Sequence, residues 1–122
     1  MSDNATYVRE LTEAVPRLQP LLARHVEYFD ELLSHVFMGE VSRFAVAEFA
    51  RCTDGEGSGC PDLIALLAAL EQGFCDGGED VQNLIAVSFL ENVAEEAVVS
   101  PGLLSLFGPL LRREIQPFLD MY

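Results

Sequence analysis

The residues best suited to chemistry are sparse in this chain, beginning with its two histidines. His25 falls on the apolar face of a helical pattern that runs from Leu18 to Phe29, so we predict a core histidine. His35 lies on a different face, and no ExxH, HExxH or HxH spacing surrounds either histidine. Ser34 precedes His35, but successive helix residues point about 100° apart and cannot form a catalytic dyad. These residues therefore predict neither a metal site nor a nucleophile.

The three cysteines give no stronger indication of a metal site or a cofactor. Cys52, Cys60 and Cys75 are spaced unlike CxxC zinc ligands, and we expect reduced thiols, although the first two flank a glycine-rich loop and can approach each other. That loop resembles a calcium loop from Asp54 onward, but Ala65 stands where the bidentate glutamate belongs. GxSxG, P-loop and GxGxxG motifs are also missing. We predict a protein without catalytic residues, metal or cofactor.

Charge is the most distinctive property of the sequence. The chain has 122 residues, 50% of them hydrophobic, which suits one domain with one core. Its net charge is −13, from 20 acidic residues against 7 basic ones, all arginine. Such a charge disfavours binding to nucleic acid or to an anionic membrane. Between residues 52 and 111 there are ten acidic residues and no basic one. Solubility, salt adaptation and a surface for a basic protein partner all remain open as explanations.

The ends and apolar runs of the sequence predict a cytoplasmic location. Residues 1–5 are polar and acidic, unlike the basic start of a secretory signal. No run reaches the roughly 18 apolar residues of a membrane-spanning helix.

The spacing of apolar residues is helical nearly everywhere, and no segment alternates as a strand does. We predict an all-α fold: a compact bundle of about five long helices in antiparallel pairs, forming one domain over residues 1–122. A glycine-rich loop at residues 53–61 separates its two halves. Gly39 falls inside a predicted helix and suggests a close helix crossing. The expected helices cover a short segment at 7–15 and then longer ones at 18–29, about 30–51, 61–76, 81–99 and 109–119.

The segment 81–99 is apolar on almost every side and should be a central helix. Its polar residues form one stripe at helical spacing, which is the best local candidate for contact with a basic partner. The alternative is that this stripe is only the solvated edge of a buried helix. The candidate residues are Ser88, Glu91, Asn92 and Glu95, together with Glu96.

Three segments carry a resemblance to a known group of proteins: GEDVQNLIAVSFLENV at 78–93, LSHVFMGE at 33–40 and LFGPLLR at 106–112. They resemble a family of small, acidic, all-helical bacterial domains that occur in polymorphic-toxin and immunity neighbourhoods. The resemblance covers most of the chain and implies an all-helical fold. It also implies a protein-binding or toxin-neutralising role.

Charge, motif content and resemblance together predict a non-catalytic protein-binding module. We expect an immunity-like protein that neutralises a basic partner such as a toxin domain, with the acidic side chains adding association rate and specificity. Two alternatives stay open: a structural or oligomerising helical domain, and a small metal-dependent enzyme using His25, His35 and nearby carboxylates. The oligomeric state stays open as well.

Overall fold

A computed structural model of the chain describes residues 3–53 and 60–122, with the Thr53 side chain left out. All the regular structure in these residues is helical, which confirms the predicted all-α class. The helices are α1 (Asn4–Ala14), α2 (Gln19–Phe29), α3 (Ser34–Thr53), α4 (Pro61–Asp76), α5 (Gly78–Ile85), α6 (Glu91–Val99), α7 (Pro101–Leu104) and α8 (Pro109–Leu119). A 3₁₀ turn, η1 (Pro16–Leu18), precedes α2, and a π-helical turn, η2 (Ala86–Leu90), joins α5 to α6.

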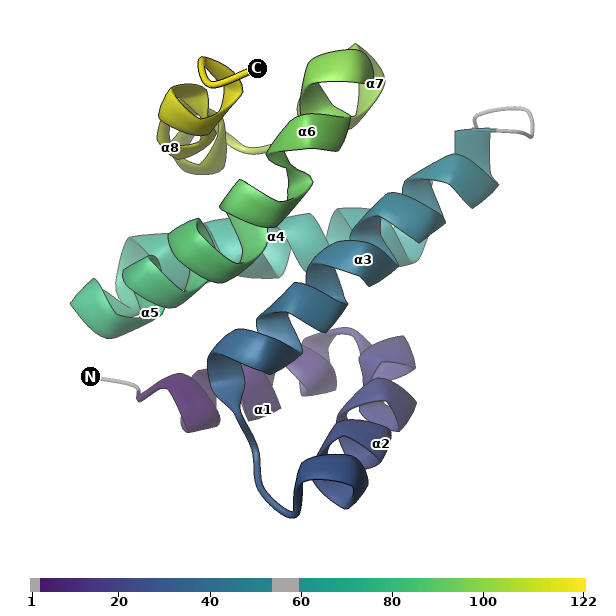
Figure 1. Cartoon of the computed structure of the whole chain (residues 1–122), viewed down its shortest axis with the longest axis vertical. Helices are drawn as coiled ribbons and strands as arrows, with labels where there is room; N and C mark the ends of the chain where they lie inside the picture. The colour runs from purple at the N-terminus through teal and green to yellow at the C-terminus, as the bar shows by residue number, and fades with distance from the viewer. Residues whose placement is uncertain (1–2, 54–59) are drawn as a thin grey trace.

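The helices are arranged along the long axis of the molecule. α1 and α2 lie at one end, α6, α7 and α8 at the other, and α3, α4 and α5 between them (Figure 1). α4 packs against α1, α5 and α8, while α3 crosses the π-helical turn η2. The middle of the helical run 78–99 therefore lies at the centre of the packing, as the apolar sequence of residues 81–99 predicts, while α6 extends to one end.

The core is built from the apolar faces that the helical spacing indicates. On α4 the buried positions recur three and four residues apart, which places them on one side of the helix. Fully burying one such leucine contributes about 1.5–3 kcal/mol relative to leaving it exposed. The largest fully buried side chains are Phe37, Phe89, Leu11, Leu18, Met38, Leu63, Leu66, Leu67, Leu70, Leu84, Ile85 and Leu90.

The predicted start of α3 at about residue 30 is wrong. Asp30 has a left-handed backbone, with φ of 61°, and ends α2. An aspartate tolerates this conformation better than most residues, because its short polar side chain can bond locally. The backbone N–H of Leu33 then donates to Nε2 of His25 at 3.0 Å, and α3 begins only at Ser34.

The predicted loop at residues 53–61 lies mainly outside the described residues. Thr53 is the last residue of α3, and Pro61 is the first residue of α4 with Asp62 in its first turn. Residues 54–59, including the calcium-loop resemblance that starts at Asp54, lie outside the described part of the chain.

Charged residues interrupt the longest helical runs. α3 has 20 residues, but Glu40, Arg43, Glu48 and Arg51 lie along it. Among residues 3–53 and 60–122, no helix combines the length and the apolar character that a membrane crossing requires.

Candidate interaction surface on the helical run 78–99

A π-helical turn marks the middle of the run that carries the predicted stripe. The N–H of Glu91 donates to the carbonyl of Ala86, five residues back, instead of four. The Nδ2 of Asn92 donates to the Ser88 carbonyl at 2.8 Å. Single π turns inside α-helices are rare and occur often at functional sites. This turn shifts the helical phase between Ser88 and the residues that follow it.

Ser88 faces α3 rather than solvent. Its side chain is buried, and its Oγ lies 2.5 Å from Nδ1 of His35, a contact between residues 53 apart in sequence. The tautomer of the His35 imidazole decides whether Nδ1 or the Ser88 hydroxyl donates the hydrogen. No described carboxylate forms an ion pair with His35. The contact between Ser88 and His35 joins α3 to η2.

The rest of the predicted stripe does reach the surface. Glu91, Asn92 and Glu95 are exposed, and Glu96 is half-buried. Glu96 accepts a hydrogen bond from the Ser100 hydroxyl at 2.7 Å. Ser100 directly precedes α7, but its hydroxyl does not cap that helix. Glu91 and Glu95 form no ion pair with any residue in the described ranges.

Exposed valines accompany these carboxylates. Val87 is 44% exposed and Val98 is 41% exposed. Glu91 lies four residues after Val87, Glu95 four residues after Glu91, and Val98 three residues after Glu95. Such spacings place side chains on one side of a helix. Val99, at the end of α6, is 70% exposed. We call Val87, Glu91, Asn92, Glu95, Glu96, Val98 and Val99 the α6 strip.

Other acidic residues between positions 52 and 111, the segment without basic residues, form hydrogen bonds or ion pairs within the protein. Both oxygens of Glu71 accept backbone N–H groups at the start of α8, from Leu110 at 2.9 Å and Leu111 at 3.0 Å. Asp62 pairs with Arg17 at 3.0 Å. Some acidic residues of this segment therefore connect helices, and others are exposed on the surface.

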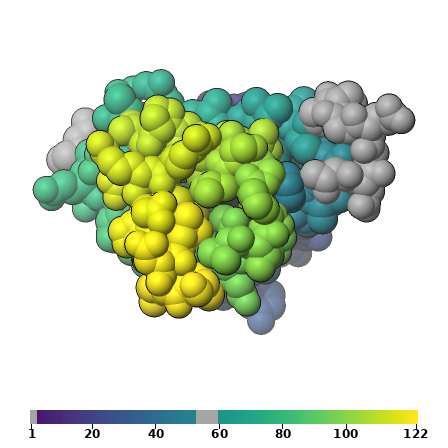
Figure 2. All heavy atoms as spheres, turned by 90° about the horizontal axis from the view of Figure 1, so that it is seen from above, coloured from purple at the N-terminus to yellow at the C-terminus, as the bar shows by residue number. Residues whose placement is uncertain are grey.

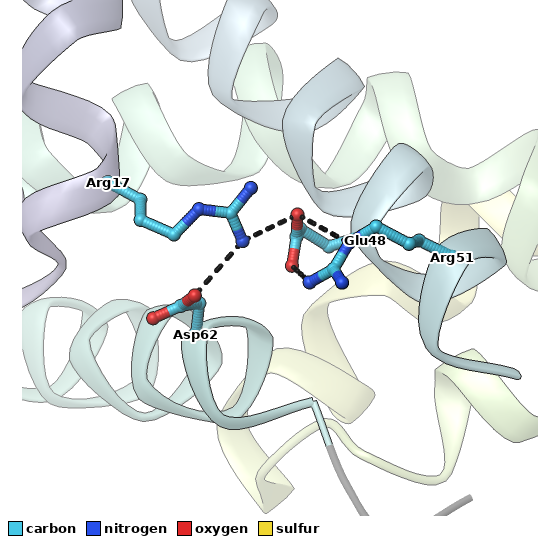
Figure 3. Close-up of polar contacts among 4 residues, drawn as sticks. All are labelled: Arg17, Glu48, Arg51 and Asp62. Atoms are coloured by element: carbon cyan, nitrogen blue, oxygen red, sulfur yellow. Dashed lines mark hydrogen bonds and ion pairs between the residues drawn. The ribbon is translucent and has the colours of Figure 1, made fainter. Parts of the chain in front are cut away.

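The most extensive ionic network lies away from the α6 strip. Glu48 is buried on α3, and Arg51 Nη2 reaches its Oε2 at 2.8 Å while Arg17 Nη1 reaches its Oε1 at 2.7 Å. Arg17 also bridges to Asp62 of α4 (Figure 3). The Arg51 hydrogen bond, with that of Arg17, outweighs burial and lowers the pKa of Glu48. The guanidinium of Arg17 lies 5.3 Å from the ring centre of Phe44. This network ties η1, α3 and α4 together.

His25 is a core residue, as its place on the apolar face predicts. It is 2% exposed, and the rings of Phe29 and Phe37 contact it. Its Nε2 accepts the Leu33 N–H, so Nδ1 carries the hydrogen and donates to Glu40 at 2.7 Å. Both ring nitrogens are thus used in joining α2 to α3.

The three cysteines are free thiols with different surroundings. Burial and a hydrogen bond with Cys52 raise the pKa of Cys60 to about 11. Cys75 is exposed, and its hydrogen bond with Asp76 raises its pKa. Within residues 3–53 and 60–122, no three His, Cys, Asp or Glu side chains are placed so as to hold a metal ion.

Gly39 lies where α3 passes Asn92 of α6, but the two helices do not approach as closely there as the sequence suggests. A Cβ built at Gly39 would lie 3.7 Å from Nδ2 of Asn92, which is ordinary contact. The closer approaches are at glycines for which no such contact was predicted. A Cβ at Gly73 would lie 2.4 Å from Cε1 of Tyr7, and one at Gly108 would lie 2.5 Å from Cδ of Glu71.

Comparison with known proteins identifies one family. Residues 8–122 match the model of a domain of unknown function, DUF7674. The chain belongs to this family. No curated protein and no solved structure matches it significantly. The match to DUF7674 thus covers almost the whole helical domain, including the α6 strip.

The residues that sequence reasoning missed are the valines of the strip. The pattern marks Val87 and Val98 as part of a helix that is apolar nearly all round, which favours burial. When a helix is apolar nearly all round, its periodicity alone does not show which of its sides no other helix covers. The spacing of Val87 and Val98 from Glu91 and Glu95 is the signal in the sequence that would have placed them on the open side.

Proposed function

We propose that this DUF7674 protein is a non-catalytic binding module that holds a basic protein partner through the α6 strip. The observation that carries the proposal is a pair of exposed carboxylates, without ion pairs among the described residues, flanked by the exposed valines Val87 of η2 and Val98 of α6. Glu91 and Glu95 supply the charge, and Val87 and Val98 supply apolar contact.

The position of α6 suits contact with another molecule. α6, α7 and α8 lie next to one another at one end of the molecule, and Figure 2 looks directly onto them. The contacts of α3 with η2 and α6 fix the position of the helix that carries the strip. A surface fixed in this way loses little conformational freedom on binding, which favours affinity.

The two kinds of side chain on the strip have separate roles in association. Exposed carboxylates attract a basic partner over about a Debye length and raise the association rate. Valines that become buried on contact stabilise the complex once it has formed, and well-packed central contacts carry most binding energy. A partner that matches the strip has lysine or arginine around an apolar patch.

A second copy of the chain suits the strip poorly. In a two-fold contact the same surface meets itself, so Glu91 and Glu95 would face Glu91 and Glu95. Like charges facing each other cost free energy and slow the encounter. A basic partner of a different kind is the better match to a chain with net charge −13.

The finer proposal is that the partner is a toxin domain and that this protein is its immunity protein. It is supported by the resemblance to small acidic helical domains of toxin and immunity neighbourhoods and by the strip's charge. If the toxin acts on nucleic acid, the carboxylates of Glu91 and Glu95 would occupy its phosphate-binding groove.

Capture of the partner from the native lysate tests the proposal with three baits: the wild type, Glu91→Gln/Glu95→Gln, and Glu27→Gln/Glu31→Gln. Both double variants remove two negative charges, but Glu27 lies on α2, at the opposite end of the long axis from α6, and Glu31 follows the end of α2 (Figure 1). We call this control the α2 variant. At low salt we expect the wild type and the α2 variant to retain a basic protein, and the α6 variant to retain none. At high salt we expect all three baits to lose it. Equal recovery on all three baits, or no basic protein on any, would overturn the proposal.

A further inference from the structure

A cleft of about 400 Å³ opens between α1 and α4, and none of its lining residues belongs to the α6 strip. Ligand pockets in proteins measure roughly 300–1,000 Å³, so the cleft has the volume for a side chain or a small molecule. It is lined by Tyr7, Glu10, Leu11 and Ala14 of α1, by Ala69, Gln72, Gly73 and Asp76 of α4, and by Gly77.

Small residues and a fixed aromatic ring shape the floor of the cleft. Tyr7 is buried, and its hydroxyl donates to the Ala69 carbonyl at 3.1 Å. Its ring fits against α4 only because residue 73 is glycine, since a Cβ there would lie 2.4 Å from Tyr7 Cε1. Leu11 is buried beside it. The floor is therefore apolar and held in place before any ligand arrives.

The rim carries one exposed carboxylate from each helix. Glu10 lies on α1 and Asp76 at the end of α4, and neither forms an ion pair within residues 3–53 and 60–122. Asp76 accepts a hydrogen bond from Gln72. Burial, and then the charge of Glu10, raise the pKa of Tyr7. No arginine lines the cleft.

We propose that this cleft, formed in part by α1 at the end of the molecule opposite α6, binds an arginine side chain of a protein at a surface separate from the α6 strip. The inference goes beyond the proposed function, which concerns the α6 strip alone. The aliphatic stem would lie against Leu11, Ala14 and Ala69, and the guanidinium would lie between Glu10 and Asp76. A guanidinium has five N–H donors in one plane, so it can donate to carboxylates on two sides at once. A neutral apolar group would desolvate both carboxylates without compensation, and an anion would be repelled.

Hexylguanidinium is a probe that tests the cleft without any partner. We would titrate it into isotope-labelled protein and follow the backbone amide signals of Gly73 and Gly77. The expected result is saturable movement of both signals that the neutral analogue hexanol does not reproduce. Glu10→Gln/Asp76→Asn should weaken the probe's affinity about tenfold, which corresponds to about 1.4 kcal/mol.

The matched control is Glu13→Gln/Glu27→Gln, which also removes two exposed carboxylates but none that lines the cleft. It should leave the probe's affinity within about twofold of the wild type. Three outcomes would overturn the inference: no saturable movement, equal binding of hexanol, or equal loss of affinity in both double variants. Because no partner is present, these outcomes are distinct from failure of the α6 capture experiment.

Discussion

The Glu71 carboxylate accepts the backbone N–H of Leu110 at 2.9 Å, across 39 residues of sequence. Its other oxygen accepts the N–H of Leu111 at 3.0 Å, so a side chain from α4 caps the N-terminus of α8. A carboxylate is the favoured partner there, because the first N–H groups of a helix lack partners within the helix and its dipole is positive at that end. Gly108 leaves the space through which the Glu71 side chain reaches α8.

Removing this cap should destabilise the domain. Glu71→Ala leaves two N–H groups of α8 without their partner and should lower the free energy of unfolding by about 1–2 kcal/mol. Urea unfolding at neutral pH measures the change. Glu91→Ala is the control, because that carboxylate is exposed and unpaired, and it should change stability by less than about 0.5 kcal/mol.

Gly108→Ala should act through the same cap. A Cβ at this position would lie 2.5 Å from Cδ of Glu71 and displace the carboxylate. We therefore expect Gly108→Ala to cost less in the Glu71→Ala background than in the wild type, where it also breaks the cap. Equal costs in the two backgrounds would show that Gly108 and Glu71 are not coupled.

Two helical glycines should respond to alanine with opposite signs. At Gly73 the new Cβ overlaps the fixed ring of Tyr7, and we expect a net loss of about 1–2 kcal/mol. At Gly39 the Cβ has room, so the higher helix propensity of alanine should stabilise the protein by up to about 1 kcal/mol. Urea unfolding of both variants measures the changes, and a shared sign would contradict the packing described here.

The Glu48 network should make stability depend on pH in the acid range. Its two arginines lower the pKa of Glu48 below the ordinary value of 4.5, so the ionised form is favoured by folding. Its contribution is complete above about pH 4.5 and is lost as pH falls through the lower, folded-state pKa. Glu48→Gln should therefore be less stable than the wild type at neutral pH, and the gap should narrow on acidification.

Unfolding by urea at a series of pH values measures this gap. Glu91→Gln serves as the comparison, since Glu91 is exposed and has no ion pair among the described residues. Its difference from the wild type should stay small throughout. A Glu48→Gln difference that is constant down to the acid transition would show that the ion pairs contribute no pH-dependent stability.

The thiols should react with iodoacetamide at different rates in the folded protein. The thiolate is the reactive form, and the pKa of Cys60 is raised to about 11 by burial and by Cys52. Cys75 is exposed. At about pH 8 we expect Cys60 to be alkylated more slowly than Cys75, with similar rates once the chain is unfolded. Mass spectrometry of digested samples gives both rates, and faster labelling of folded Cys60 would contradict its burial.

The sequence predicted those features that depend on local spacing. The apolar faces of α4 and α8, and the core position of His25, follow from helical periodicity and agree with the structure. The apolar face of α2 is only partly buried, since Val26 on it is exposed. The start of α3 was misplaced because the left-handed turn at Asp30 interrupts an apolar pattern that continues through it.

Features made by distant pairs were not predictable in this way. The contact of His35 with Ser88 joins residues 53 apart, and the Glu71 cap joins residues 39 apart. The π turn likewise has no local signature, and Ser88 of the predicted stripe lies within it. Glu91 and Glu95 reach the surface as predicted, whereas Ser88 turns toward α3.

The central claim is that the α6 strip attracts a basic partner, and the association rate constant tests it most directly. The captured partner, once purified, would be mixed by stopped flow with the wild type, Glu91→Gln/Glu95→Gln and Glu27→Gln/Glu31→Gln over a range of ionic strength. We predict that only the α6 variant associates several-fold more slowly and with a flatter salt dependence. An unchanged rate constant for the α6 variant, or an equal fall for both variants, would contradict the assignment of the strip.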